Sequence, residues 1–184
     1  MKKITPTLPK GTRDFGPKEM KKREYLFKIF KDTFSLYGFN ALETPSMENI
    51  NVLNGKYGEE GDKLIFRILD SGDFIKGVDY IESKDSNNLR KEISKKGLRY
   101  DLTVPFARYV SMNRDKITLP FKRYQIQNVW RADRPQKGRF REFYQCDVDY
   151  IGTKSIICEA EIIDLVYSIF EKLKIQDFSV KLNN

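Results

Sequence analysis

Two strand-like segments joined by a short polar connection constrain this chain more than any other feature. Residues 121–131 and 141–151 have strand character, and residues 132–140 connect them. The second segment alternates between two faces. One face holds Tyr144, Cys146, Val148 and Tyr150, and the other holds Phe143, Gln145, Asp147, Asp149 and Ile151. The pattern predicts a long hairpin with one apolar face, on which Cys146 would belong to the core.

Helical periodicity flanks this hairpin. Apolar spacing of three and four residues predicts helices over about 17–37 and 155–174, and Thr103 with Pro105 predicts a helix from 103 to about 113. Shorter apolar runs predict strands over 39–43, 63–69, 98–101 and 178–182, the second and third pairing with each other. Residues 71–97 contain glycines and a polar run, which predicts a loop or an insertion. The expected fold class is α+β, with an antiparallel sheet flanked by helices.

The composition excludes several kinds of chemistry. The chain of 184 residues has no histidine and only two cysteines, Cys146 and Cys158. Histidine bases, histidine-ligated metals, four-cysteine zinc sites and a disulfide framework are therefore excluded, and no metal site is predicted. The formal net charge of +8 favours polyanionic partners. No apolar stretch is long enough to span a bilayer and the first residues do not form a secretory signal, so we expect a cytoplasmic protein.

Four arginines lie close together in and beside the connection, at positions 131, 134, 139 and 141. Guanidinium groups at this density can hold a polyphosphate through paired hydrogen bonds. A charged, solvated turn is an equally good interpretation of the charge density alone.

The polar face of the second strand suggests a ligand site. Gln145 and Asp149 are four residues apart, roughly 13 Å along a strand, a span that suits a small zwitterion held at both ends. Asp101 and Thr103 stand where a strand gives way to a helix, and Asp101 could hold an ammonium group. The alternatives are an exposed sheet face for the first pair and a turn or cap for the second.

Four segments together resemble the histidyl-tRNA synthetase family of class II aminoacyl-tRNA synthetases. Residues 131–149 read RADRPQKGRFREFYQCDVD and resemble the motif 2 of that family. Residues 10–14 (KGTRD) resemble its N-terminal signature, residues 38–45 its motif 1, and residues 98–109 (LRYDLTVPFARY) its histidine-binding segment. The residues of the last segment and of motif 2 resemble the eukaryotic and archaeal branch more closely than the common bacterial form.

The resemblance implies a reaction without a protein nucleophile. The carboxylate of the substrate histidine attacks the α-phosphate of ATP, pyrophosphate leaves, and the adenylate then esterifies tRNA(His). Arg131 would be catalytic and bind ATP with Asp133 and Arg139, while Mg²⁺ is held through the nucleotide. The residues implied for binding histidine are Asp101, Thr103, Gln145 and Asp149, with Asp149 reading the imidazole.

The resemblance also implies partners and limits. Gln136 and Lys137 would contact the tRNA acceptor end, and motif 1 implies a homodimer. The family's motif 3 and anticodon-binding domain are absent from residues 1–184, so we expect the N-terminal part of a catalytic domain that is inactive alone. The alternative is a non-catalytic synthetase paralogue that binds histidine and acts as a regulatory subunit; retention of Arg131, Arg139, Gln145 and Asp149 favours the enzyme.

Overall fold

The computed structural model describes residues 5–78 and 85–182, and for residues 56–62 it describes the backbone alone. The chain forms two compact units built from interleaved segments. Unit 1 contains Met1–Arg13, Glu43–Asp115 and Gln127–Gln145; unit 2 contains Asp14–Leu42, Lys116–Ile126 and Cys146–Asn184.

Unit 1 is built on a small antiparallel sheet. Its strands β2 (Met47–Asn49), β4 (Lys96–Leu98) and β3 (Arg67–Ile68) lie in the order β2-β4-β3. In the register, Gly97 of β4 lies opposite Glu48 on one side and Arg67 on the other. The predicted pairing of 63–69 with 98–101 is confirmed only in part: β3 pairs with residues 96 and 97, and Leu98 N–H donates to Phe66 O at 2.8 Å. Strand β2 was not predicted.

Helix α2 (Ile50–Leu64) packs closely on this sheet. Its Ile50 and Leu53 are buried with Ile65, Tyr100 and Val104 in one core. A Cβ atom at Gly97 would lie 2.7 Å from Ile65 Cγ2 and 2.9 Å from Ile50 Cδ1. A glycine in the central strand is therefore what lets the core residues approach the backbone.

Two helices of unit 1 differ from the sequence expectation. Helix α2 was not predicted because glycines at 55, 58 and 61 lower its helix propensity, whereas burial of its apolar face stabilises it. Residues 71–97, predicted as a loop or insertion, contain α3 (Ser86–Ile93), whose first turn is capped by the Asp85 side chain accepting from Asn87 N–H at 3.3 Å. Residues 79–84 of that segment lie outside the described residues.

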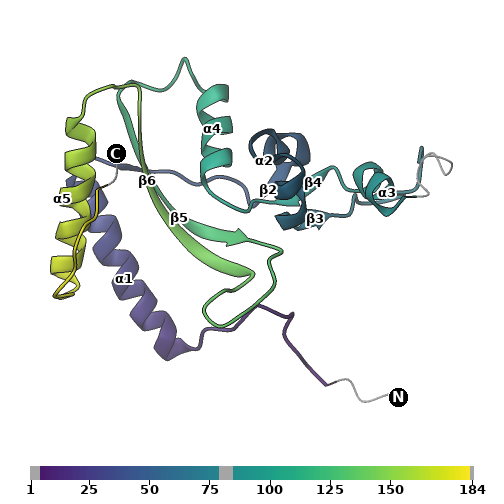
Figure 1. The fold of residues 1–184 in the computed structure, drawn as a ribbon, viewed down its shortest axis with the longest axis horizontal. Helices are drawn as coiled ribbons and strands as arrows, with labels where there is room; N and C mark the ends of the chain where they lie inside the picture. The colour runs from purple at the N-terminus through teal and green to yellow at the C-terminus, as the bar shows by residue number, and fades with distance from the viewer. Residues whose placement is uncertain (1–4, 79–84, 183–184) are drawn as a thin grey trace. The chain divides into compact units, whose positions relative to one another are not determined.

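Unit 2 contains the two long helices. α1 (Pro17–Leu36) and α5 (Ile157–Lys172) lie side by side (Figure 1) and confirm the helices predicted from periodicity. Between them lies a core of Phe34, Phe39, Tyr124, Leu165 and Ile169. The predicted strand over 178–182 is not formed; Phe178 instead packs its ring 4.8 Å from that of Phe170.

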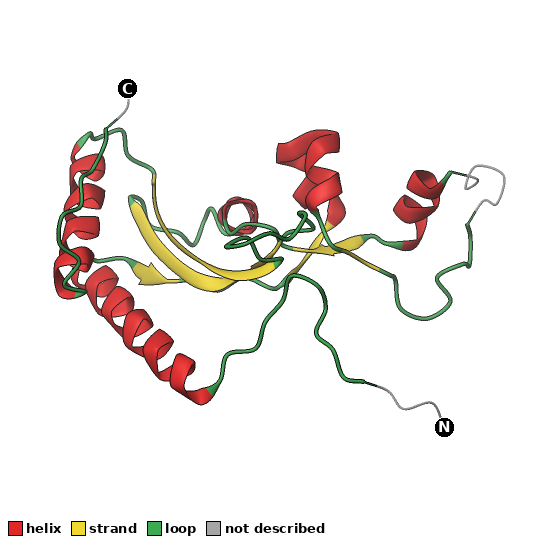
Figure 2. Ribbon diagram, turned by 60° about the horizontal axis from the view of Figure 1, so that its bottom comes forward, coloured by secondary structure: helices red, strands yellow, loops and turns green. Residues whose placement is uncertain are grey.

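The second sheet has the order β1-β5-β6, and the long twisted pair β5 (Phe121–Trp130) and β6 (Glu142–Ile151) is its main feature (Figure 2). Both strands were predicted to within one residue. β1 (Asn40–Ala41) pairs with β5 in parallel, with Ala41 opposite Tyr124. The expected antiparallel sheet is therefore a mixed sheet. The α+β class with sheet and flanking helices is confirmed. Cys146 is exposed rather than part of the core.

Helix α4 (Thr103–Met112) completes unit 1 and packs against α2. Across the described residues, no helix combines the length and the apolar character that crossing a bilayer requires.

Candidate active site

Arg131 directly follows β5 and is fixed by several contacts within unit 1. Its backbone N–H donates to Arg141 O at 2.9 Å, which pairs the two ends of the connection. Its Nε donates to Tyr100 O at 3.0 Å. The guanidinium carbon lies 5.6 Å from the Tyr100 ring centre and 5.2 Å from that of Phe143. The two rings and the hydrogen bond from Nε hold the guanidinium in place, and its other N–H donors are available for a ligand.

The connection that follows Arg131 folds back on itself. Gln136 and Arg139 exchange backbone hydrogen bonds at 3.3 and 2.9 Å, which makes a tight turn with Lys137 at its tip. Arg139 Nη2 lies 3.3 Å from Asp133 Oδ1. The Arg139 side chain is 55% exposed and that of Asp133 is 15% exposed, so the arginine remains reachable from solvent.

These residues enclose a pocket of about 260 Å³, here called the arginine pocket. Its lining residues are Arg13, Arg131, Asp133, Gly138, Arg139, Phe140 and Phe143. Three guanidinium groups therefore face one carboxylate across a space with aromatic walls. A pocket with this excess of positive charge suits an anionic ligand, and bidentate donors suit phosphate oxygens.

The structure separates the four arginines that the sequence grouped together. Arg131 and Arg139 line the pocket, whereas Arg134 is exposed and is not among its lining residues. Arg141 donates from Nε to Asp133 O at 3.0 Å, so it braces the backbone of the connection. The expectation of a four-arginine clamp is therefore corrected to two of these arginines plus Arg13.

Arg13 reaches the pocket from the N-terminal arm, the segment 9–13. The arm is attached to the connection because Arg141 N–H donates to Gly11 O at 2.8 Å. Gly11 has φ +88°, and a Cβ there would lie 2.9 Å from both Arg141 Cγ and Pro135 Cγ. The sequence marked residues 10–14 as a family signature, but no spacing rule assigned Arg13 to the pocket.

Asp101 and Thr103 occupy the start of α4. Asp101 is 6% exposed, and its Oδ1 accepts from Val104 N–H at 3.1 Å. Thr103 is exposed and lies in the first turn of the helix rather than at the cap position, which Leu102 occupies. The capping role expected of Thr103 thus falls to Asp101.

Gln145 has an unusual environment. Its Oε1 is buried and has no hydrogen-bond partner among the residues described. A buried amide oxygen without a partner costs roughly 1–3 kcal/mol. Such an atom is an available acceptor for an ammonium group, which agrees with the histidine-binding role that the family resemblance implies for Gln145.

Asp149 belongs to unit 2, where its Oδ2 lies 2.6 Å from Arg123 Nη2. The Arg123 side chain is fully buried and Asp149 is 34% exposed. Sequence reasoning missed Arg123, because its position in a strand gave no sign of a buried cation. The tRNA-contact candidates Gln136 and Lys137 are exposed on the turn of the connection.

The buried Arg99 stabilises the backbone beside Tyr100. Arg99 is 2% exposed and donates to Thr44 O at 2.5 Å, Pro45 O at 3.1 Å and Asn128 O at 2.9 Å. Burial lowers the pKa of its guanidinium, and the Glu43 and Glu48 carboxylates act in the opposite direction. Arg99 precedes Tyr100, whose carbonyl accepts from Arg131, so it fixes the backbone on which Arg131 rests.

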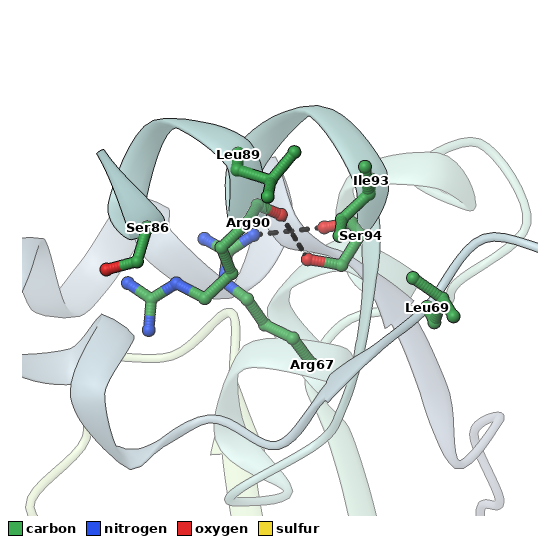
Figure 3. Close-up of a pocket in the computed structure, with 7 residues that line it drawn as sticks. All are labelled: Arg67, Leu69, Ser86, Leu89, Arg90, Ile93 and Ser94. Atoms are coloured by element: carbon green, nitrogen blue, oxygen red, sulfur yellow. Dashed lines mark hydrogen bonds between the residues drawn. The ribbon is translucent and has the colours of Figure 1, made fainter. Parts of the chain in front are cut away.

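Another pocket lies between β3 and α3 (Figure 3). Leu69, Leu89 and Ile93 form its apolar part, and Arg67 Nη1 donates to Ser94 O at 3.0 Å beside it. No residue singled out by the sequence lines this pocket, and its arginines are engaged in the local structure. The arginine pocket is therefore the candidate site.

Solved structures share this fold. A histidyl-tRNA synthetase from Nostoc sp. PCC 7120 superposes with a TM-score of 0.70 at 28% identity, over 93% of this chain and 35% of that one. A pyrrolysyl-tRNA synthetase from Desulfitobacterium hafniense superposes at 0.63 and 15% identity, over 85% of this chain and 48% of that one. The fold is that of class II aminoacyl-tRNA synthetases.

Sequence relatives narrow the class. Residues 90–184, half of the chain, match the family model described as histidyl-tRNA synthetase. A histidine–tRNA ligase of Cytophaga hutchinsonii is 61% identical over 97% of this chain, and one of Bacteroides fragilis is 56% identical over 97%. This chain belongs to the histidyl-tRNA synthetase family. The chain spans about 40% of the length of these relatives. The relatives are bacterial proteins, so they do not support the expected closeness to the eukaryotic and archaeal branch.

Proposed function

We propose that this chain supplies the motif 2 part of a histidine–tRNA ligase, which activates histidine with ATP and transfers it to tRNA(His). The observation that carries the proposal is the arginine pocket, where Arg131 is held rigidly at a strand end and faces Arg139 and Asp133. Membership of the family supports the same reaction. Activation of a carboxylate by ATP needs placement and charge stabilisation, and a chain without histidine can provide both.

In this proposal Arg131 acts on the reacting atoms. Its guanidinium contacts the α-phosphate of ATP and the carboxylate of histidine, so it brings nucleophile and electrophile together and stabilises the charge that develops at phosphorus. Arg139 binds the γ-phosphate side, and Asp133 orients Arg139 through their 3.3 Å contact. Mg²⁺ would neutralise the phosphates through nucleotide oxygens, which is its usual mode of binding. Three guanidiniums facing one carboxylate fit that polyphosphate.

Histidine is assigned to Asp101, Thr103, Gln145 and Asp149. The unpartnered Oε1 of Gln145 supports this assignment, because an α-ammonium group would supply the missing donor. Asp149 would accept from a ring N–H, with Arg123 holding its carboxylate. A site built from hydrogen-bonding groups rejects amino acids without a matching donor by a factor of about 10⁴ or more.

Further parts of the proposal concern the whole protein. Gln136 and Lys137 contact the acceptor end of tRNA(His), because they are exposed on the turn beside the pocket. The protein acts as a homodimer in the cytoplasm, as the resemblance of residues 38–45 to motif 1 and the family membership suggest.

The test is histidine-dependent exchange between ATP and pyrophosphate in the full-length protein. We expect exchange in the unaltered protein and a loss of at least a hundredfold in kcat for Arg131→Ala, with little change in histidine affinity. Arg134→Ala removes an exposed arginine of the same connection and should keep normal exchange. A protein that binds histidine but shows no exchange would be a regulatory paralogue and not a ligase.

A further inference from the structure

The arginine pocket contains one cation that the motif 2 resemblance does not assign. Arg13 belongs to the N-terminal arm, yet it lines the same 260 Å³ space as Arg131 and Arg139. We infer that Arg13 is a phosphate-binding residue of this site and that it contacts the terminal phosphates of the nucleotide. The inference rests on the proposed function and adds a residue to its nucleotide site.

The surroundings of Arg13 prepare it for a planar contact. Its guanidinium carbon lies 3.9 Å from the centre of the Phe140 ring. Stacking against an aromatic face fixes the plane of the guanidinium. Phe140 itself lines the pocket, so the stacked group stands at the pocket wall.

The arm that bears Arg13 is fixed to the pocket by its backbone. Gly11 O accepts from Arg141 N–H at 2.8 Å, and Thr12 N–H donates to Pro9 O at 3.1 Å. Arg141 in turn donates from Nε to Asp133 O at 3.0 Å. A side chain on an anchored backbone loses less entropy when it binds, which raises the affinity for the ligand.

Size and charge favour phosphate groups over a whole nucleotide. Pockets that enclose a complete small ligand measure about 300–1,000 Å³, so a space of 260 Å³ is suited to one end of a ligand. Asp133 offsets one of the three positive charges, which leaves an excess of positive charge that suits phosphate groups. Arg131 approaches from the strand end, Arg139 from the turn and Arg13 from the arm, so the phosphates are surrounded by separate chain segments.

The experiment compares nucleotide binding by variants of the full-length protein. Arg13→Gln should raise the Kd of ATP in calorimetry, and its KM in pyrophosphate exchange, by about tenfold, which is the scale of one charge-assisted hydrogen bond. Arg13→Lys keeps the charge without the bidentate geometry, so its Kd for ATP should lie between the values of the unaltered protein and of Arg13→Gln. The Kd of AMP, which lacks the terminal phosphates, should change less than twofold.

Arg23→Gln is the matched control. The Arg23 guanidinium also stacks on a ring, 3.9 Å from the centre of Phe15, but it does not line the pocket. This variant removes the same charge and the same kind of stacking, and should leave ATP binding unchanged. Equal losses in both variants would reduce the effect to overall charge and overturn the inference.

Four further outcomes separate the alternatives. If Arg13→Gln weakens AMP as much as ATP, the residue does not contact the terminal phosphates. If it raises only the KM of tRNA in aminoacylation, the phosphate belongs to the nucleic acid; either result overturns the inference. Normal ATP binding and exchange in Arg13→Gln would overturn the inference about Arg13 and leave the proposed function standing. Absence of exchange in the unaltered protein would overturn both the inference and the proposed function. Thermal unfolding verifies that each variant is folded.

Discussion

At the scale of single residues, the histidine-binding role proposed for Gln145 would link ligand binding to stability. Its buried Oε1 has no partner in the part of the chain that the structure describes, so the folded protein bears the cost of an unsatisfied acceptor. We predict that Gln145→Leu raises the KM of histidine at least tenfold, while the free energy of unfolding stays equal or increases by up to about 1 kcal/mol.

Pyrophosphate exchange and thermal unfolding measure these two effects in the same preparation. Gln176→Leu, at an exposed position, provides the same substitution away from the site. A destabilised Gln145→Leu protein with normal histidine kinetics would identify Gln145 as a structural residue only.

Asp149 presents the reverse case, because it is paired with a fully buried guanidinium. Asp149→Asn leaves the Arg123 charge without its carboxylate, and we predict a loss of about 1–3 kcal/mol in stability, less than for a fully buried pair because Asp149 is partly exposed. Discrimination between histidine and other amino acids should also fall.

A double variant separates these two roles of Asp149. Arg123→Met with Asp149→Leu replaces the ion pair by apolar groups, which is often neutral for stability. We expect stability to recover and histidine selection to remain lost, as measured by denaturant unfolding and by exchange with competing amino acids. Recovery of both would exclude Asp149 from the specificity site.

The residues of the arginine pocket show where sequence reasoning succeeds. Arg131, Asp133 and Arg139 lie near one another in the chain, so the expected turn already brings two of them together. Arg13 and Arg123 were not assigned because each acts on a partner distant in the chain, and neither spacing nor charge density reveals such a contact.

At the scale of elements, the attachment of the arm depends on Gly11. An alanine there would place Cβ 2.9 Å from Arg141 Cγ and Pro135 Cγ at a φ of +88°, so it adds both a steric clash and backbone strain. We predict that Gly11→Ala displaces the arm, costs about 1–3 kcal/mol of stability and raises the KM of ATP.

Gly77→Ala isolates the strain from the clash. Gly77 has a similar φ of +83°, but no atom of the described residues lies within 4 Å of a Cβ built there. It should lose some stability and leave the KM of ATP unchanged. If both variants bind ATP normally in the full-length protein, the arm does not shape the pocket.

Elements with a strong periodic pattern were predicted well. The apolar spacing of α1 and α5 and the alternation of β6 indicated the type and position of these elements, and β5 was predicted as the other strand of the hairpin. α2 and the segment after α5 were not predicted correctly, since the first is stabilised by packing against its propensity and the second lies against helix α5 through Phe178 without pairing as a strand. Tertiary contacts determine the secondary structure of such segments, and the local sequence pattern does not reveal those contacts.

At the scale of the whole molecule, the chain alternates between its two units along the sequence. Strands β5 and β6 contribute residues to both, so no change of composition or linker marks a boundary. The sequence therefore indicated the family through four ordered segments but gave no sign of the division. Gln145 and Asp149, which the alternation of β6 placed on one face, fall in different units.

The net charge of +8 is a property of the chain as a whole and gives it a general attraction for polyanions. Phosphate contacts by lysine and arginine make the logarithm of affinity fall linearly with the logarithm of salt concentration, by about one unit of slope for each contact.

A general attraction is spread over many cations, whereas the proposed contact at the turn is specific to Lys137. We therefore predict that Lys137→Gln in the full-length protein weakens tRNA(His) binding and reduces the salt slope by about 1. Lys28→Gln removes an equal charge from an exposed lysine paired with Asp32 at 2.7 Å in unit 2 and should leave the slope unchanged. Identical slopes for the two variants, measured by filter binding over a salt series, would mean that overall charge and not the turn positions the tRNA.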